Sequence, residues 1–224
     1  MNPTSKFHES WKPLLSYLET DPMMKKLSQE ILPNTKYYPE KEDIFNVFQM
    51  PVEDIKVVIL GQDPYPNEGQ AIGYAFAVSE DTPKPASLKI IEKEIGSVLD
   101  RTLSHWTGQG VFLLNTALTV KVKEAGSHLQ YWDGFIKQVI SFISLKNRVV
   151  WLLWGKKAQA FTPYITRRSE FKTLAEIADF NIILNAAHPA AEAYSGGKAG
   201  FYGCNHFNLV NEILQQQQKS TIVW

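Results

Sequence analysis

Short apolar runs alternate with amphipathic stretches along most of the 224-residue chain. Four of the runs are rich in β-branched or aromatic residues and carry almost no polar positions, which is typical of strands buried on both faces of a sheet. These runs are Ile55–Leu60, Val111–Leu114, Val149–Leu153 and Asn181–Leu184. Because helical stretches separate them, the pattern predicts parallel strands joined by helices.

The stretches between the apolar runs repeat their hydrophobic residues with the period of a helix. Near the N-terminus, one helical face carries Trp11, Leu14, Leu15 and Leu18. Further helices are expected at Ile44–Phe48, Ser87–Leu99, Tyr131–Ser144, Lys156–Tyr164 and Asn208–Gln215. The alternation predicts a three-layer α/β/α fold with a central four-stranded parallel sheet flanked by helices. No linker or repeat divides the chain, so we expect one domain over residues 1–224.

Composition and charge narrow the class of protein. Hydrophobic residues make up 44% and charged residues 21%, as in soluble globular proteins. Lys plus Arg equals Asp plus Glu at 23 each, which argues against a large nucleic-acid footprint but permits a small, locally basic face. The single cysteine, Cys204, fits a reducing compartment. No signal peptide or membrane-spanning run is visible, so we expect a cytoplasmic protein without membrane contact.

Polar residues follow each expected strand. Asp63 follows the first, Asn115 the second, Gly155-Lys156 the third and His188 the fourth. The carboxyl ends of parallel strands meet at one edge, so these groups should converge there. Taken singly each is weak evidence, because a glycine at a strand end is usually a turn and an aspartate there is often a helix cap.

The chemistry of this set favours hydrolysis. No activated nucleophile, phosphate-binding loop or zinc-type histidine pairing is visible, so we expect neither a metal nor another cofactor. One carboxylate and one histidine suit a reaction with a cationic transition state and an anionic leaving group. Asn115 offers both a donor and an acceptor to an amide-like edge, and Phe76 could stack on a flat ring.

Several strings in the chain resemble family 1 uracil-DNA glycosylases. They are VVILGQDPY, GVFLLNTALTV, and HP followed by GFYGCNHF, and the similarity extends from about Tyr38 to Trp224. The resemblance implies the family's fold, a central four-stranded parallel sheet flanked by helices. It also implies hydrolysis of the N-glycosidic bond between uracil and deoxyribose in DNA, after the base has left the stack.

The resemblance assigns roles to individual residues. Asp63 matches the aspartate that activates water and stabilises the oxocarbenium-like sugar. His188 matches the histidine that stabilises the uracil anion at O2, for which a neutral imidazole suffices. Asn115 matches the asparagine that reads the uracil edge. Phe76 matches the stacking aromatic, and Tyr65 the residue that blocks C5 and excludes thymine.

Further residues match the surroundings of the base and the DNA-binding loops. Gln62 would offer a backbone N–H to a uracil oxygen. Ser87, in the Pro-rich loop, would meet a phosphate, and the alternative is a plain helix N-cap. Gly155-Lys156 lies where the family usually has Gly-Ser. Lys156 would keep a phosphate contact there, and the alternative is a solvated helix start.

The chain departs from the family's pattern at two places. Pro66 replaces the histidine that usually ends GQDPYH, and we expect hydrolysis to survive this change. The loop Ala190–Ala199 makes the HP-to-GFYG segment three residues longer than usual, and Glu192 stands where the family has its wedge leucine. Tyr194 would wedge or stack in its place and Lys198 would reach a phosphate, with Gly196-Gly197 giving the loop slack. The alternative is a solvated insertion in which Tyr194 packs on the protein.

Three functions stay open at this stage. The first is an active, monomeric uracil-DNA glycosylase that acts on single- and double-stranded DNA and could bind a DNA-mimicking inhibitor protein. The second is a uracil- or abasic-DNA-binding protein or scaffold with weak catalysis, motivated by the altered loop. The third is a small-molecule α/β hydrolase that acts on free nucleosides.

Overall fold

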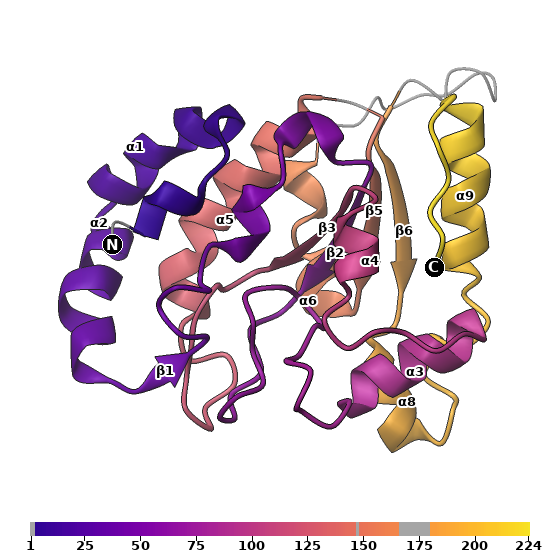
Figure 1. The fold of residues 1–224 in the computed structure, drawn as a ribbon, viewed down its shortest axis with the longest axis horizontal. Coiled ribbons are helices and arrows are strands. Elements are labelled where there is room, and N and C mark those ends of the chain that lie inside the picture. The colour runs from indigo at the N-terminus through magenta and orange to yellow at the C-terminus, as the bar shows by residue number, and fades with distance from the viewer. Residues whose placement is uncertain (1–2, 147, 166–179) are drawn as a thin grey trace.

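A four-stranded parallel sheet forms the centre of the molecule (Figure 1). The structure is a computed structural model that describes residues 3–146, 148–165 and 180–224. The strands lie in the order β3-β2-β5-β6, and every neighbouring pair is parallel. Their bounds are β2 (Val57–Gly61), β3 (Val111–Asn115), β5 (Val150–Trp154) and β6 (Ile182–Ala186). The predicted fold class is confirmed, and the four expected strands lie within two residues of their predicted starts.

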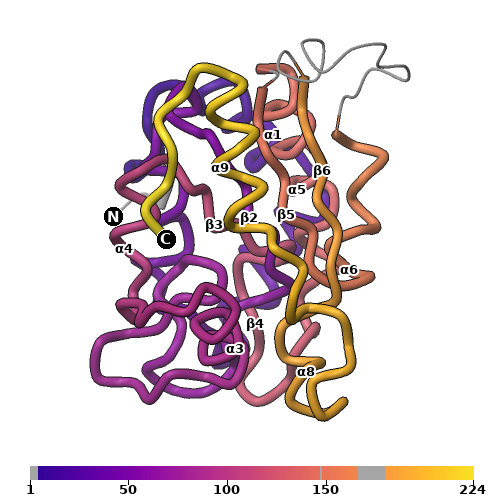
Figure 2. Tube along the Cα trace, turned by 90° about the vertical axis from the view of Figure 1, so that its right-hand side faces the viewer, coloured from indigo at the N-terminus to yellow at the C-terminus, as the bar shows by residue number. Residues whose placement is uncertain are grey.

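Helices cover both faces of this sheet, and Figures 1 and 2 show the three layers from two sides. One face carries α1 (Lys12–Thr20), α2 (Pro22–Lys26), α5 (Leu129–Ser144) and α6 (Lys156–Gln159). The other carries α4 (Ser104–Thr107) and α9 (His206–Gln216). Beyond the carboxyl ends of the strands, α3 (Ala86–Ile95) packs against α8 (Pro189–Ser195).

Shorter elements complete the chain. A two-stranded antiparallel sheet pairs β1 (Tyr37–Tyr38) with β4 (Val120–Lys121). The short helical turns are η1 (Pro3–Lys6), η2 (Glu9–Trp11), η3 (Leu27–Ile31), η4 (Leu32–Asn34), η5 (Asn46–Gln49), η6 (Val52–Asp54) and η7 (Thr162–Tyr164).

The central strands are apolar throughout because their side chains alternate between two buried layers. In β2, Val58 and Leu60 join the core beneath α5, whereas Val57 and Ile59 join the core beneath α9. All five residues of β2, β3 and β5 are buried. Full burial of one such side chain contributes about 1.5–3 kcal/mol, so polar groups are costly anywhere except at the strand ends.

Aromatic side chains attach the chain ends to these two cores. Trp11 is fully buried, donates its indole N–H to the Met50 carbonyl at 2.8 Å, and stacks on Phe112 with 5.4 Å between ring centroids. On the other face, Trp106 packs edge-on against the C-terminal Trp224 at 5.1 Å. The N-terminal helices and the C-terminus are therefore held on the same sheet that carries the site.

Two expected helices are shorter than predicted. The one expected to reach Leu99 ends at Ile95, because Gly96 adopts a left-handed conformation with φ 76° that terminates α3. The one expected at Lys156–Tyr164 is divided into α6 and η7, and Pro163 lies in the first turn of η7, where its missing N–H is tolerated.

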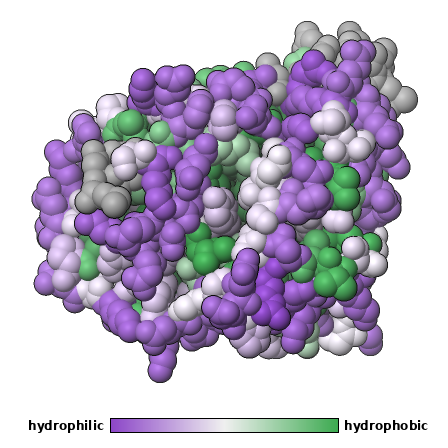
Figure 3. Space-filling view, in the orientation of Figure 1, coloured by the Kyte–Doolittle hydropathy of each residue, from purple (hydrophilic) through white to green (hydrophobic). Residues whose placement is uncertain are grey.

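The face seen in Figure 1 is mainly hydrophilic, and its hydrophobic residues form separate patches in Figure 3. Within the described ranges, no helix has the length and apolar character needed to cross a membrane.

Candidate active site

The strand ends bring the predicted polar residues to one edge of the sheet. Asp63 follows β2 by two residues, Asn115 ends β3, Gly155 follows β5 and His188 follows β6. Gly61 pairs with Asn115 in the parallel ladder, and a Cβ on Gly61 would stand 2.3 Å from Asn115 Oδ1. Only glycine therefore allows the buried Asn115 amide to lie this close to the β2 end.

Gly155 and His188 fit against each other in the same way. Gly155 has φ 89° and donates its N–H to the Ala186 carbonyl at 2.9 Å. A Cβ on Gly155 would stand 2.9 Å from His188 Cβ. The end of β5 thus needs glycine both for its left-handed backbone and for the position of the histidine.

The His188 side chain is oriented by the helix that it precedes. It is the N-cap of α8, and its Nδ1 accepts the Ala190 N–H at 3.1 Å. In the neutral imidazole this leaves the proton on Nε2, which becomes the donor. Burial, followed by the positive charge of Lys157, lowers the pKa of His188, so the ring is neutral at pH 7.

Asp63 is held by a neighbouring loop. Its Oδ2 accepts the backbone N–H of Gly126, and Lys123 of the same loop donates its N–H to the Pro66 carbonyl at 3.0 Å. Burial raises the pKa of the Asp63 carboxyl, whereas the Gly126 N–H, the charge of Lys157 and the Gln62 side chain act in the opposite direction. A partly desolvated carboxylate is thereby fixed in direction and kept available for chemistry.

Phe76 stands beside the histidine in a strained backbone conformation. Its φ is 65°, in the left-handed region that a bulky residue seldom occupies. Its ring lies 5.9 Å from His188 and 5.5 Å from Trp154, centroid to centroid. The preceding residue, Ala75, donates its N–H to the Leu113 carbonyl at 3.0 Å, which ties this turn to β3. Backbone strain of this kind persists only where the surrounding contacts hold the residue in place, and it is most common at binding sites.

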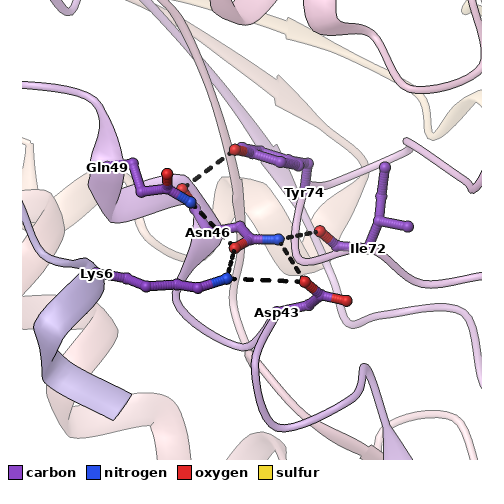
Figure 4. Close-up of polar contacts among 6 residues, drawn as sticks. All are labelled: Lys6, Asp43, Asn46, Gln49, Ile72 and Tyr74. Carbon is purple, nitrogen blue, oxygen red and sulfur yellow. Dashed lines mark hydrogen bonds and ion pairs between the residues drawn. The ribbon is translucent and has the colours of Figure 1, made fainter. Parts of the chain in front are cut away.

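A polar network behind this turn holds the chain that leads to Phe76 (Figure 4). The Asn46 side chain donates to Asp43 and to the Ile72 carbonyl at 2.9 and 3.0 Å, and Tyr74 donates its hydroxyl to the Asn46 carbonyl at 3.2 Å. Gly73, with φ 85°, lies so close to the Asp43 carbonyl that a Cβ would stand 2.0 Å away. The ring at the site is therefore positioned by residues nearly thirty positions earlier in the chain.

Tyr65 and Ser87 contact each other. Their hydroxyl oxygens are 2.8 Å apart, and Ser87 is buried. The alternative that Ser87 caps its helix is wrong, because Pro85 occupies the N-cap of α3 and Ser87 lies within the first turn. Burial raises the pKa of the Tyr65 phenol, so the ring carries a neutral hydroxyl that the serine orients.

The segment after His188 differs from the expected slack loop. Residues Pro189–Ser195 form α8, and Gly196 ends the helix in a left-handed conformation with φ 62°, so this glycine terminates a helix rather than loosening a loop. Tyr194 is 91% exposed, so the alternative that it packs on the protein is wrong. Lys198 lies on the exposed turn that follows.

Glu192, which the sequence resemblance aligns with the family's leucine, points inward. It is 3% exposed, and its carboxylate accepts the backbone N–H groups of Ala199 and Tyr202 at 3.1 Å and that of Phe201. These bonds lower the pKa of Glu192 in spite of its burial. The carboxylate therefore fixes the returning chain against α8, and the last turn of the helix presents Tyr194 to solvent.

Three contributors to the site were not found from the sequence. Gly126 acts only through its backbone N–H, Lys157 acts through its charge, and Glu192 acts as an internal anchor. None of them has a residue type or spacing that marks such a role. In the part of the chain that the structure describes, no group of three or more His, Cys, Asp or Glu side chains is arranged to hold a metal ion.

Together, the fold and the site define a parallel α/β protein with an ionisable carboxylate, a neutral histidine donor, an amide and an aromatic ring at one sheet edge. Residues 48–215 match the model of the uracil DNA glycosylase superfamily. The chain belongs to this superfamily, and it is a base-excision repair enzyme that removes uracil from DNA.

Relatives resemble the chain over most of its length. The uracil-DNA glycosylase of Aliarcobacter butzleri is 38% identical over 96% of this chain and 100% of its own. The human uracil-DNA glycosylase is 37% identical over 97% of this chain and 69% of its own. The crystal structure of mimivirus uracil-DNA glycosylase superposes with a TM-score of 0.85, at 24% identity, covering 100% of this chain and 89% of that one.

Gly155→Ala should impair catalysis by displacing His188. The added Cβ meets His188 Cβ at 2.9 Å and the backbone must leave φ 89°. A displacement of about 1 Å in an active site costs about a hundredfold in rate, and we expect a loss of that order in kcat for uracil release. Gly96→Ala is the matched control, since it is also left-handed but has no atom within 4 Å of the added Cβ. Equal losses in both variants would contradict a specific effect on His188.

The acid side of the pH–rate profile should depend on Lys157. Its charge lowers the pKa of both Asp63 and His188, so it favours the ionised carboxylate and the neutral imidazole together. As the pH falls, activity is lost when either group gains a proton. Lys157→Gln should raise both pKa values and move this loss to higher pH, measured as kcat at saturating substrate. Lys89→Gln, on the exposed side of α3, should leave the profile unchanged.

Proposed function

We propose that Asp63 and His188 divide the hydrolysis of the N-glycosidic bond between them. The Asp63 carboxylate orients a water toward C1′ of the flipped nucleotide and stabilises the positive charge that develops on the sugar. The observation that supports this role is its fixed direction, set by the Gly126 N–H, combined with partial burial. A charge in such a site acts more strongly than in water, because less solvent screens it.

His188 stabilises the leaving group. As the C–N bond breaks, its electron pair passes to the uracil ring, and the Nε2–H of His188 donates a hydrogen bond to O2 of the anion. The acceptance of the Ala190 N–H by Nδ1 supports this tautomer, and the lowered pKa supports a neutral ring. A neutral donor suits an anion that departs without being protonated first.

Four residues select the base. Asn115 reads the polar edge of uracil and rejects cytosine, in which the hydrogen-bond donor and acceptor of this edge are exchanged. The Gln62 backbone N–H contacts a uracil oxygen. Phe76 stacks on the ring, supported by its contact with Trp154. Tyr65 blocks the C5 position against the thymine methyl group, with its hydroxyl held by Ser87.

DNA is held by groups around this edge. Lys156 and Lys198 are exposed and would contact phosphates. Gly155, which has no side chain, permits a close approach of the DNA backbone to the end of β5. Ser87 stays a predicted phosphate contact, although its hydroxyl already has Tyr65 as a partner. With zero net charge, a few local contacts of this kind would carry the electrostatic part of binding.

Tyr194 is the proposed wedge. Its ring is 91% exposed at the last turn of α8, and the Glu192 carboxylate anchors that turn from the inside. An aromatic ring supported in this way would fill the space left by the flipped base, where stacking contributes about 1–3 kcal/mol per base.

The partners and location of the enzyme are part of the same proposal. We propose that the enzyme acts as a cytoplasmic monomer on single- and double-stranded DNA. A DNA-mimicking inhibitor protein is also a candidate partner, because a tyrosine-to-leucine variant of mimivirus UNG has been crystallised in complex with UGI.

Asp63→Asn and His188→Ala should each lose most uracil release. Removing a catalytic acid–base group costs about 10²–10⁴ in rate, and we expect losses of this size in kcat on a uracil-containing oligonucleotide. Free deoxyuridine, assayed beside it, should be a poor substrate for the wild type. Wild-type rates in both variants would contradict the assigned roles, and efficient cleavage of deoxyuridine would favour a nucleoside hydrolase.

Tyr194→Ala should impair the reaction on duplex DNA more than on single strands, because only the duplex leaves a gap that must be filled. The lost stacking predicts about a tenfold decrease in kcat/KM on duplex substrate. Tyr194→Phe keeps the ring and should retain activity. If Tyr194→Ala matched wild type on duplex DNA, the wedge role would be wrong.

A further inference from the structure

A cavity of about 800 Å³ lies at the opposite end of the sheet from the active site. It is lined by residues within two positions of the starts of three strands: Lys56 before β2, Gly110 before β3 and Arg148 before β5. Parallel strands place all their amino ends at one edge, so the cavity and the catalytic residues lie at opposite edges. Its volume is typical of sites for small ligands.

One wall of this cavity carries four cationic side chains, which we call the basic cluster: Lys56, Lys146, Arg148 and Lys219. All four are held by contacts within the protein, three of them through ammonium groups. The Lys56 ammonium donates to Ser220 Oγ at 2.6 Å, and the ammonium groups of Lys146 and Lys219 donate to the carbonyls of Val52 and Arg148. An ammonium group has three donors, so each of these lysines keeps further donors for a ligand.

Arg148 is the one guanidinium of the basic cluster. Its Nη2 donates to the Gln217 carbonyl, but its buried Nε has no hydrogen-bond partner. A buried donor without a partner is costly and is uncommon in folded proteins. Its own φ of 58° adds to the local strain of this turn.

The charges of the basic cluster are poorly balanced. Among the described residues, none of its four members has a carboxylate within 4 Å, since the ion pairs lie elsewhere on the molecule. Glu53 and Asp54 also line the cavity, so two carboxylates face four cations, and they act on Lys146 from beyond ion-pair distance. Burial and the three neighbouring cations lower the pKa of Lys219 to about 8. The surplus of positive charge would be relieved by a bound anion.

Two polar residues that line the cavity, Asn46 and Tyr74, already have hydrogen-bond partners for their side-chain donors. The Asn46 side chain uses both its amide oxygen and its amide nitrogen in the network of Figure 4, where Lys6 and Gln49 donate to it at 2.7 and 3.1 Å. Tyr74 likewise donates to a carbonyl in that network. Asn46 and Tyr74 therefore leave no side-chain donor free, whereas the basic cluster does.

We propose that this cavity binds a small phosphate-bearing anion, such as pyrophosphate or the phosphate chain of a free nucleotide, through the basic cluster. Clustered lysine and arginine donors suit phosphate oxygens, and the Arg148 guanidinium has N–H donors besides the one that the Gln217 carbonyl occupies. A free compound is favoured over the DNA backbone for two reasons. The cationic groups line a cavity rather than an open surface, and DNA engaged at the catalytic edge lies at the other end of the sheet.

The test is calorimetric titration of the wild type with pyrophosphate at pH 7 and constant ionic strength. We expect saturable binding that Lys219→Gln and Arg148→Gln each weaken by about tenfold or more, because each removes charge-assisted hydrogen bonds. Lys25→Gln, which removes one exposed cation from α2, is the matched control and should bind like the wild type.

Two further measurements keep the test decisive. Thermal unfolding without ligand should show that Lys219→Gln is folded and no less stable, since it relieves charge repulsion, and a uracil-free oligonucleotide should bind it as tightly as the wild type. Absence of pyrophosphate binding to the wild type, or equal weakening in Lys25→Gln, would overturn the site. Loss of oligonucleotide affinity in Lys219→Gln with pyrophosphate affinity unchanged would instead assign the cluster to DNA.

Discussion

The burial of the central strands on both faces is the constraint on which the site depends. Every residue of β2, β3 and β5 is buried, so polar side chains are excluded from these strands except at their ends, as at Asn115. The chain can place a carboxylate or an amide only where a strand ends. Because the strands are parallel, these ends meet, and Asn115 and Asp63 come to the same edge from β3 and β2. The glycines at this edge follow from the same constraint, since the strand ends approach more closely than a Cβ allows.

Carboxylates that accept backbone N–H groups recur around the site. Asp63 accepts from Gly126, Glu192 accepts from Ala199, Phe201 and Tyr202, and Glu94 on α3 accepts from Gly203 and Asn205. Glu192 and Glu94 thus hold the same returning segment from α8 and from α3, the two helices that pack together beyond the strand ends. Hydrogen bonds to a charged acceptor are stronger than neutral ones, so a loop of irregular backbone is fixed without a hydrophobic core of its own.

The sequence was sufficient to predict the sheet, its flanking helices and the residues at the strand ends. Those predictions depend on the periodicity of apolar residues and on the alternation of apolar runs with helical stretches, which implies parallel strands. The sequence was insufficient where the role of a residue depends on contacts with residues distant in the chain. Gly126 acts through a backbone N–H, which every residue except proline possesses. Gly196 ends a helix, and the Ala-rich segment that begins with Pro189 was a signal for that helix in the sequence. Ser87 was assigned as a possible cap because it precedes a helical pattern, but the helix begins one residue earlier.

The inward orientation of Glu192 changes how the segment Ala190–Ala199 is understood. A leucine wedge at that register would have to point outward, whereas here the side chain is buried and holds three backbone donors, one of them Phe201 from the GFYG string. The position therefore cannot serve both as anchor and as wedge. Two residues further along an α-helix the direction of the side chain has turned by about 200°, so an inward Glu192 places Tyr194 on the outer face. The buried Glu192 anchor and the exposed Tyr194 ring are thus two consequences of one short helix.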